Sequence, residues 1–215
     1  MTRGRTLPRA FYDRDARVVA PALLNKVLVA GRGDARLAAR IVEVEAYCGA
    51  DDPGSHAFRG PTARNATMFG PPGHWYVYFT YGMHWCVNAV CGPAEHPHAV
   101  LLRAAAPLTG LDVMRSRRIA ARRDRDLCSG PARLAQAFGI DRALDGADIV
   151  KGELRIVDDG TAPPDRPGVS TRIGLGTGRG DDLAWRYAVV GEPNLSRPAG
   201  PPAGRRTRPR RPGPC

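Results

Sequence analysis

Two segments of the chain hold residue types that could act on a substrate, and the first is residues 40–47 (RIVEVEAY). Its even positions from Val42 to Ala46 are apolar, whereas the odd positions past Ile41 are Glu43, Glu45 and Tyr47. Side chains of a β-strand alternate between its two faces, so we expect the apolar residues to cover a core and the carboxylates to share the other face with the tyrosine ring. A carboxylate placed there could polarise a water molecule or stabilise oxocarbenium-like charge on a sugar.

The second segment, residues 75–83 (WYVYFTYGM), is rich in aromatic residues and contains a Tyr-Gly turn. We predict strands over 75–80 and 83–90 that are joined in a tight hairpin. Enzymes that act on a base within duplex DNA extrude the nucleotide into a pocket. Tyr81 could fill the resulting gap from the minor groove, and Tyr47 and Tyr78 could stack on the base. Packing in a core or an interface is the commoner role of such a hairpin and stays open.

Two polar residues interrupt strands that are otherwise apolar. Arg103 lies in VLLRA (residues 100–104), where a buried guanidinium is costly unless it is paired, and a catalytic carboxylate would be a natural partner. Asn88 lies in CVNAV (residues 86–90) and needs hydrogen bonds or contributes selectivity. From the residues alone, Glu43 and Glu45 compete for the catalytic role, and either could simply face solvent.

The charge of the chain favours a phosphate-rich partner. The net charge is +11, and arginine carries nearly all the positive charge because only two lysines are present. Residues 197–215 hold six arginines and no acid, and removing these six from +11 leaves +5 for the rest of the chain. No apolar run has the length of a membrane span, and acidic residues interrupt any signal-peptide pattern near the N-terminus. We therefore expect a nucleoid-associated protein in the bacterial cytoplasm.

The cysteines do not form a recognisable framework. Five cysteines without a CxxC pair favour buried free thiols over disulfides or zinc, and we expect no metal and no cofactor.

The pattern of elements predicts a mixed α/β (α+β) protein with a single domain over residues 1–196 and a disordered tail over 197–215. Residues 1–13 are expected to form a loosely held arm, and residues 48–73 a long functional loop. Helices are predicted over 16–24 and 111–123, and from Ser129-Gly130-Pro131, with a capping residue and an early proline, to Gly139. Strands are predicted over 27–30, 37–47, 75–80, 83–90, 99–105, 154–157, 171–175 and 185–190.

Eight segments, taken in order, make the chain resemble the alkyladenine (3-methyladenine) DNA glycosylase family of base-excision repair enzymes. The resemblance spans residues 7–196. The matching segments are residues 40–47 (RIVEVEAY), 52–56 (DPGSH), 61–65 (PTARN), 68–69 (MF), 76–88 (YVYFTYGMHWCVN), 100–104 (VLLRA), 127–134 (LCSGPARL) and 172–176 (RIGLG).

The resemblance implies a curved antiparallel sheet with flanking helices and a protruding hairpin that inserts into DNA. It implies a monofunctional enzyme that acts as a monomer on duplex DNA containing damaged purines. The residue roles that it implies are Glu45 as general base, Arg103 as holder of the attacking water, Tyr47, His56 and Tyr78 as stacking partners of the flipped purine, Tyr81 as the intercalating wedge, and Asn88 as the residue that obstructs the 2-amino group of guanine.

The resemblance leaves the range of lesions open. Three places depart from the family pattern, so substrate range is less defined than reaction type: His74-Trp75, His84-Trp85 and the turn over residues 92–98. A damage-binding protein without catalysis is the rival interpretation, against which the presence of both Glu45 and Arg103 weighs. A zinc nucleobase deaminase would need an H-x-E…P-C-x-x-C ligand set, which the sequence lacks.

Overall fold

The long strand β3 (Leu37–Cys48) organises the sheet of the computed structural model, which describes residues 4–31 and 33–202. From Ala38 to Cys48 it pairs antiparallel with β6 (His98–Thr109). On its other edge it pairs first with β2 (Val27–Ala30) and then with β9 (Arg186–Ala188). Because β2 and β9 share this edge, a segment from the C-terminal part of the chain lies directly beside residues 43–45.

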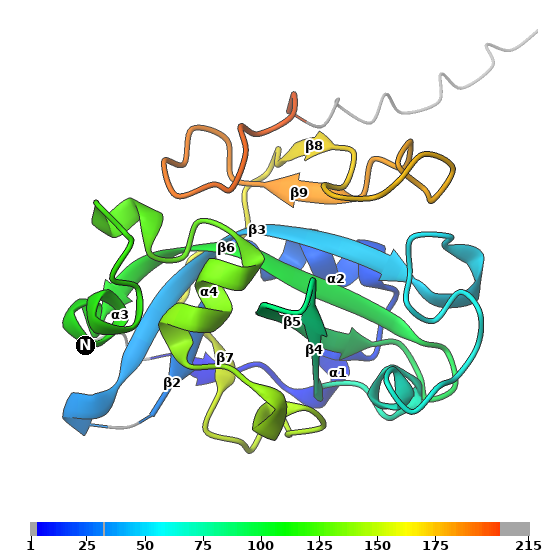
Figure 1. Cartoon of the computed structure of the whole chain (residues 1–215), viewed down its shortest axis with the longest axis horizontal. Coiled ribbons are helices and arrows are strands. Elements are labelled where there is room, and N and C mark those ends of the chain that lie inside the picture. The colour runs from blue at the N-terminus through cyan, green and yellow to red at the C-terminus, as the bar shows by residue number, and fades with distance from the viewer. Residues whose placement is uncertain (1–3, 32, 203–215) are drawn as a thin grey trace, which may run out of the picture.

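The remaining strands extend this sheet in both directions. The order is β1-β7-β2-β3-β6-β5-β4, and β8 pairs with β9. The curved sheet with helices against it, seen in Figure 1, confirms the predicted fold class. The bounds of these strands are Arg5–Thr6 for β1, Trp75–Thr80 for β4, His84–Cys91 for β5, Arg155–Asp158 for β7 and Gly168–Ser170 for β8.

From Glu43 to Tyr47 the predicted alternation separates a core face from a site face, whereas Ile41, which precedes the register shift, lies in the main core despite its odd position. Val44 and Ala46 are fully buried in the main core. Helix α2 (Ala16–Leu23) packs against β3, and helix α4 (Pro131–Phe138) packs against β5. Burying the apolar side chains of both helices against the sheet supplies the main driving force for this arrangement.

Helix ends and the hairpin turn follow local chemistry. Pro131 is the first residue of α4, and Gly139 ends it at φ +68°. The expected capping serine does not cap, because Gly130 holds the N-cap position without a side-chain hydrogen bond. Between β4 and β5 the Met83 amide donates to the Thr80 carbonyl (3.1 Å), and both Tyr81 (φ +52°) and Gly82 (φ +65°) adopt left-handed backbone.

Three predicted elements were wrong or too long. Helix α3 spans only Leu111–Arg117, since the arginine-rich stretch beyond it has no apolar stripe and its Ile119 is 90% exposed. Residues 171–175 do not form a strand; β8 lies just before them, and Gly174 has φ +86°. The N-terminal arm contains β1 and helix α1 (Arg9–Tyr12), which is anchored by a fully buried Tyr12.

The predicted loop over 48–73 carries two 3-10 helices, η2 (Gly49–Asp51) and η3 (Ala66–Phe69). Further single turns are η1 (Gly33–Ala35), η4 (Asp124–Asp126) and η5 (Arg142–Leu144). Of the predicted tail, the Pro201 carbonyl accepts from the Val169 amide on β8 (2.9 Å), and residues 203–215 lie outside the described residues. No helix in the described part of the chain is long and apolar enough to cross a membrane.

Candidate active site

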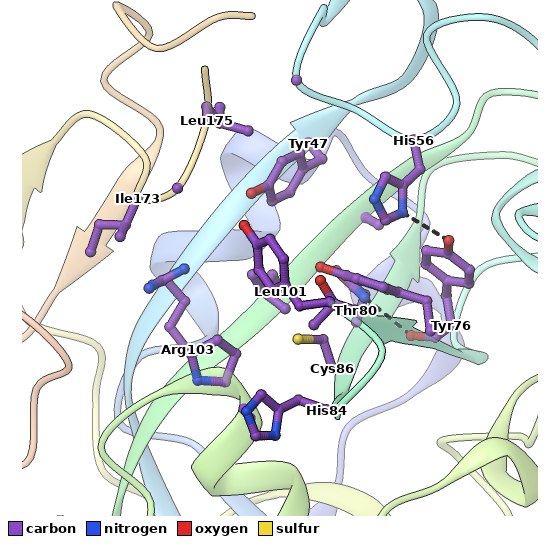
Figure 2. A pocket seen from close by; sticks show the side chains of 18 of the residues that line it. Tyr47, His56, Tyr76, Thr80, His84, Cys86, Leu101, Arg103, Ile173 and Leu175 are labelled. Carbon is purple, nitrogen blue, oxygen red and sulfur yellow. Dashed lines mark hydrogen bonds between the residues drawn. The ribbon is translucent and has the colours of Figure 1, made fainter. Parts of the chain in front are cut away.

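Four neighbouring strands turn alternate side chains into one cavity of about 360 Å³, a size typical of small-ligand pockets. Strand pairing explains how they meet: the cross-strand partners are Tyr47 and Ala99, Asn88 and Leu101, and Tyr78 and Cys86. Figure 2 shows Arg103 and Ile173 at one side of the cavity and His56 with Tyr76 at the other. Of the predicted site residues, the lining includes Tyr47, His56, Tyr78, Tyr81, Asn88 and Arg103.

Glu45 is completely buried and is not itself a lining residue, but the three residues that donate hydrogen bonds to it, Tyr47, Arg103 and Ile173, all line the cavity. Its Oε1 accepts the backbone N–H of Ile173 (2.7 Å). Its Oε2 accepts the Tyr47 hydroxyl (2.9 Å) and Arg103 Nη1 (3.2 Å). Burial raises the pKa of Glu45 above its ordinary value, and the Arg103 charge and these hydrogen bonds oppose that shift. The site thus holds a carboxylate that is more basic than usual and fixed in position.

A β-bulge aims Arg103 at the two glutamates. The pairing of β3 with β6 shifts register around residues 41–44, so that Glu43 is opposite Ala104 while Val44 is opposite Leu102. Arg103 Nε donates to Glu43 Oε1 (3.1 Å), while Nη1 reaches Glu45. The guanidinium therefore bridges both carboxylates. This confirms the prediction that an arginine in an apolar strand has a carboxylate partner.

Glu43 is also completely buried, so neither glutamate faces solvent, contrary to the open alternative. Its oxygens accept from two arginines, since Arg186 Nε donates to Oε1 (2.8 Å) alongside Arg103 Nε. Ser196 adds its hydroxyl (2.7 Å) and its backbone amide (2.6 Å). Neither glutamate lines the cavity, but Glu43 is saturated by these donors, and two of the residues that bind it, Arg186 and Ser196, are also absent from the lining.

Tyr47 is supported from behind by a buried ion pair. The Arg172 guanidinium carbon lies 4.6 Å from the centre of the Tyr47 ring, and Arg172 binds Asp52 through two contacts of 2.5 and 2.6 Å. Asp52 and Arg172 each begin a segment that matches the family pattern, residues 52–56 and 172–176, but the sequence predicted no role for either residue. The two residues carry opposite charges and stand at the start of two separate motifs. This pattern could have predicted that they form an ion pair.

The opposite side of the cavity is a cluster of three rings. His56 Nδ1 and the Tyr76 hydroxyl are 2.9 Å apart, and the His56 and Tyr78 rings meet edge to face at 4.4 Å. Burial raises the pKa of Tyr76 to about 12. Burial, together with the nearby Arg64 charge, lowers the pKa of His56. Both effects favour the neutral form of His56, and Tyr76 is a member of this cluster that the sequence did not single out.

Tyr81 and Asn88 take up very different positions. Tyr81 is 80% exposed at the hairpin tip, at the mouth of the cavity. Asn88 is buried, and its Nδ2 donates to the Tyr76 carbonyl (3.1 Å), which fixes the amide at the cavity wall.

Among the described residues one trio, Asp15, Cys48 and His98, has ligand atoms close enough together to hold a metal ion. Each has a structural explanation. Asp15 caps α2 by accepting the Arg17 amide, and His98 Nδ1 accepts the Ala16 amide (3.4 Å). Burial raises the pKa of the Cys48 thiol to about 12, so it stays protonated at neutral pH. We therefore assign Asp15 and His98 to capping the start of α2, and Cys48 is a buried thiol at the end of β3.

Comparison with known proteins identifies the family. A profile of the family "Methylpurine-DNA glycosylase (MPG)" matches residues 10–193. The chain belongs to the methylpurine-DNA glycosylase family. This membership confirms the resemblance found in the sequence, the enzyme class of DNA glycosylase, and DNA as the partner.

Curated bacterial relatives cover nearly the whole chain. A Burkholderia lata protein is 57% identical over 197 residues, which are 91% of this chain and 93% of the relative. A Streptomyces avermitilis protein is 49% identical (88% and 90% covered), and one from Koribacter versatilis is 46% identical (88% and 92%). All three carry the name "Putative 3-methyladenine DNA glycosylase".

Proposed function

We propose that this DNA glycosylase flips alkylated purines, foremost 3-methyladenine, out of duplex DNA and hydrolyses their N-glycosidic bond with a water activated by Glu45. The observation that carries the proposal is the position of Glu45, a buried carboxylate held by three hydrogen-bond donors that all line the ring-lined cavity. All the proposed site residues come from one chain, so we propose that it acts as a monomer.

The cavity suits a planar base. Arg172 covers one face of the Tyr47 ring, so a base stacks on the face that lines the cavity. His56 and Tyr78 take the other side of the base. Stacking on each aromatic residue contributes about 1–3 kcal/mol.

The chemical step needs a base for water and little else from the protein. Glu45 accepts a proton from water as the water oxygen bonds to the anomeric carbon of the deoxyribose. The bond from that carbon to the purine nitrogen breaks, and the purine leaves with the electron pair. The Glu45 charge also stabilises the oxocarbenium-like transition state, and Arg103 holds the water. Because alkylated purines are cationic, they leave as neutral bases without a proton donor, whereas hypoxanthine would need one.

Selectivity against normal guanine is proposed to come from Asn88. Its amide is held at the cavity wall by the hydrogen bond to the Tyr76 carbonyl. A rigid amide obstructs a 2-amino group by shape and by donor placement, and adenine lacks that group.

Glu45→Gln tests the mechanism in a single-turnover assay that scores free base from duplexes each carrying one defined lesion. We expect excision to slow by about 10²–10⁴-fold while affinity for lesion DNA is retained. In the wild type, the rate should fall as the pH drops through the pKa of Glu45, because the protonated carboxyl cannot accept a proton. Burial places that decline above the ordinary glutamate range.

Urea unfolding of the Glu45→Gln variant serves as the control for folding. A raised folded-state pKa means that the ionised carboxylate disfavours the fold above that pKa, so the variant should be no less stable than wild type at pH 8. Unchanged excision would remove Glu45 from the mechanism. Tight binding of lesion DNA by the wild type without base release would instead indicate a damage-binding protein.

A further inference from the structure

We infer that Glu43 and Arg186 form a positioning pair that holds Arg103 against Glu45, an inference that rests on the proposed function. Neither residue lines the cavity, and the family resemblance gave neither a role. Both are buried, and they lie on adjacent strands, β3 and β9.

Arg186 is anchored independently of the catalytic residues. Its Nη1 donates to Ser170 Oγ (2.8 Å) and to the Pro198 carbonyl (3.1 Å), and its Nη2 donates to the Arg197 carbonyl (2.7 Å). Its Nε is directed at Glu43 Oε1 (2.8 Å). A planar guanidinium with its donors engaged on several sides has little freedom to turn, so Glu43 meets a fixed positive charge.

The fixed charge of Arg186 influences how Arg103 distributes its N–H donors between Glu43 and Glu45. Arg103 has one contact with Glu43 (Nε, 3.1 Å) and one with Glu45 (Nη1, 3.2 Å). Because Arg186 neutralises Glu43, Arg103 is not drawn wholly to that carboxylate, and its charge remains available to Glu45. The cluster then holds two carboxylates and two guanidinium groups and is neutral overall, which a buried site shielded from bulk solvent requires.

Changing the charge of either outer member should therefore alter the basicity of Glu45. Arg186→Gln leaves one surplus negative charge and pulls Arg103 toward Glu43. Glu43→Gln leaves a surplus positive charge and gives Arg103 to Glu45 alone. The charged and titratable groups that face Glu45 are Glu43 and Tyr47 on β3, Arg103 on β6, Tyr78 on β4, Cys86 on β5, and Arg172 after β8. The two substitutions change none of these groups except Glu43.

The experiment measures the single-turnover rate of base release against pH, together with ¹³C-carboxyl NMR titration of Glu45, for the full-length protein. The acid limb of the pH–rate profile is the range in which the rate falls as Glu45 becomes protonated. Arg186→Gln should move this limb to higher pH, and Glu43→Gln should move it to lower pH. We expect shifts of about 0.5–1 pH unit, less than the roughly 1–3 units that a directly adjacent charge produces. The double variant Glu43→Gln/Arg186→Gln restores neutrality and should return the limb toward that of the wild type.

Two controls separate charge from structure. Arg186→Lys loses the guanidinium geometry but keeps the charge, so its limb should stay near wild type even if its stability falls. Arg40→Gln breaks another partly buried ion pair of β3, Arg40 with Asp159 (2.8 Å), and should lower stability without moving the limb.

The inference would be overturned if the acid limb lay at the same pH in wild type, Arg186→Gln and Glu43→Gln. It would also be overturned if the two substitutions moved the limb in the same direction. If Arg186→Gln does not fold, Glu43→Gln alone decides by the direction of its shift. Failure of the wild type to release base would instead overturn the proposed function, and the NMR titration would still report whether the pair acts on Glu45.

Discussion

The hairpin tip offers a substitution that should separate folding from DNA capture, namely Tyr81→Gly. Tyr81 has φ +52°, a left-handed conformation that costs an L-residue roughly 1–2 kcal/mol and costs glycine almost nothing. Its ring is 80% exposed, so removing the ring forfeits very little burial in the free protein. We therefore expect the ring to contribute to DNA capture rather than to the fold.

The expected magnitudes follow from these two facts. Relief of the backbone strain is partly offset by the larger entropy of glycine in the unfolded chain, roughly 0.5–1 kcal/mol. The free energy of unfolding of Tyr81→Gly should thus be unchanged or up to about 1.5 kcal/mol higher than that of wild type. Loss of one stacking ring should weaken binding of lesion DNA by about 1–3 kcal/mol, which is about 5- to 150-fold.

Urea denaturation measures the first quantity. Fluorescence anisotropy at one fixed salt concentration, with a duplex carrying a non-hydrolysable nucleotide analogue, measures the second. Tyr81→Ala removes the same ring but keeps a Cβ in left-handed backbone, so it should bind as weakly as Tyr81→Gly and be less stable. Tyr81→Phe keeps the ring and should bind nearly as wild type.

Two results would refute this reasoning. A Tyr81→Gly variant that is destabilised by more than about 1 kcal/mol would mean that the ring contributes to the fold. Undiminished affinity for lesion DNA would mean that Tyr81 does not occupy the gap in the base stack.

Three further predictions concern selectivity, stability and the C-terminal segment. Asn88→Ala should raise the release of normal guanine at least about tenfold, measured as free guanine from undamaged duplex, and an unchanged rate would remove Asn88 from selectivity. Asp52→Asn should lower the free energy of unfolding in urea by about 3–5 kcal/mol, because it leaves the buried Arg172 guanidinium without its anion, and a loss below 1 kcal/mol would contradict this account. Truncation after residue 202 removes five arginines and should reduce the slope of log affinity against log salt by up to about 4.5, whereas a constant slope would make the segment passive in binding.

Local patterns predicted the strands that carry the site. Alternation over residues 40–47 placed Glu45 and Tyr47 on one face, because the side-chain period of a strand is two whatever its neighbours are. A Tyr-Gly pair between two apolar runs predicted the hairpin for a similarly local reason. An arginine in an apolar strand predicted a carboxylate partner, since an unpaired buried charge is too costly, and Arg103 does lie between Glu43 and Glu45.

Residues 171–175 show where local reasoning failed. Their composition suggested a strand, yet the Ile173 amide donates to Glu45 instead of to a neighbouring strand. A strand propensity is weak compared with a hydrogen bond to a buried carboxylate. The choice between the two depends on what lies next to the segment in space.

By itself, the sequence determined which side chains share a face, where the chain turns, and to which family the protein belongs. Only the tertiary structure decided which charges meet: Arg172 with Asp52, 120 residues apart, and Arg186 with Glu43, 143 residues apart. The physical reason is that alternation and turns depend on neighbouring residues. A buried ion pair, in contrast, depends on the packing of distant segments that removes both charges from water together.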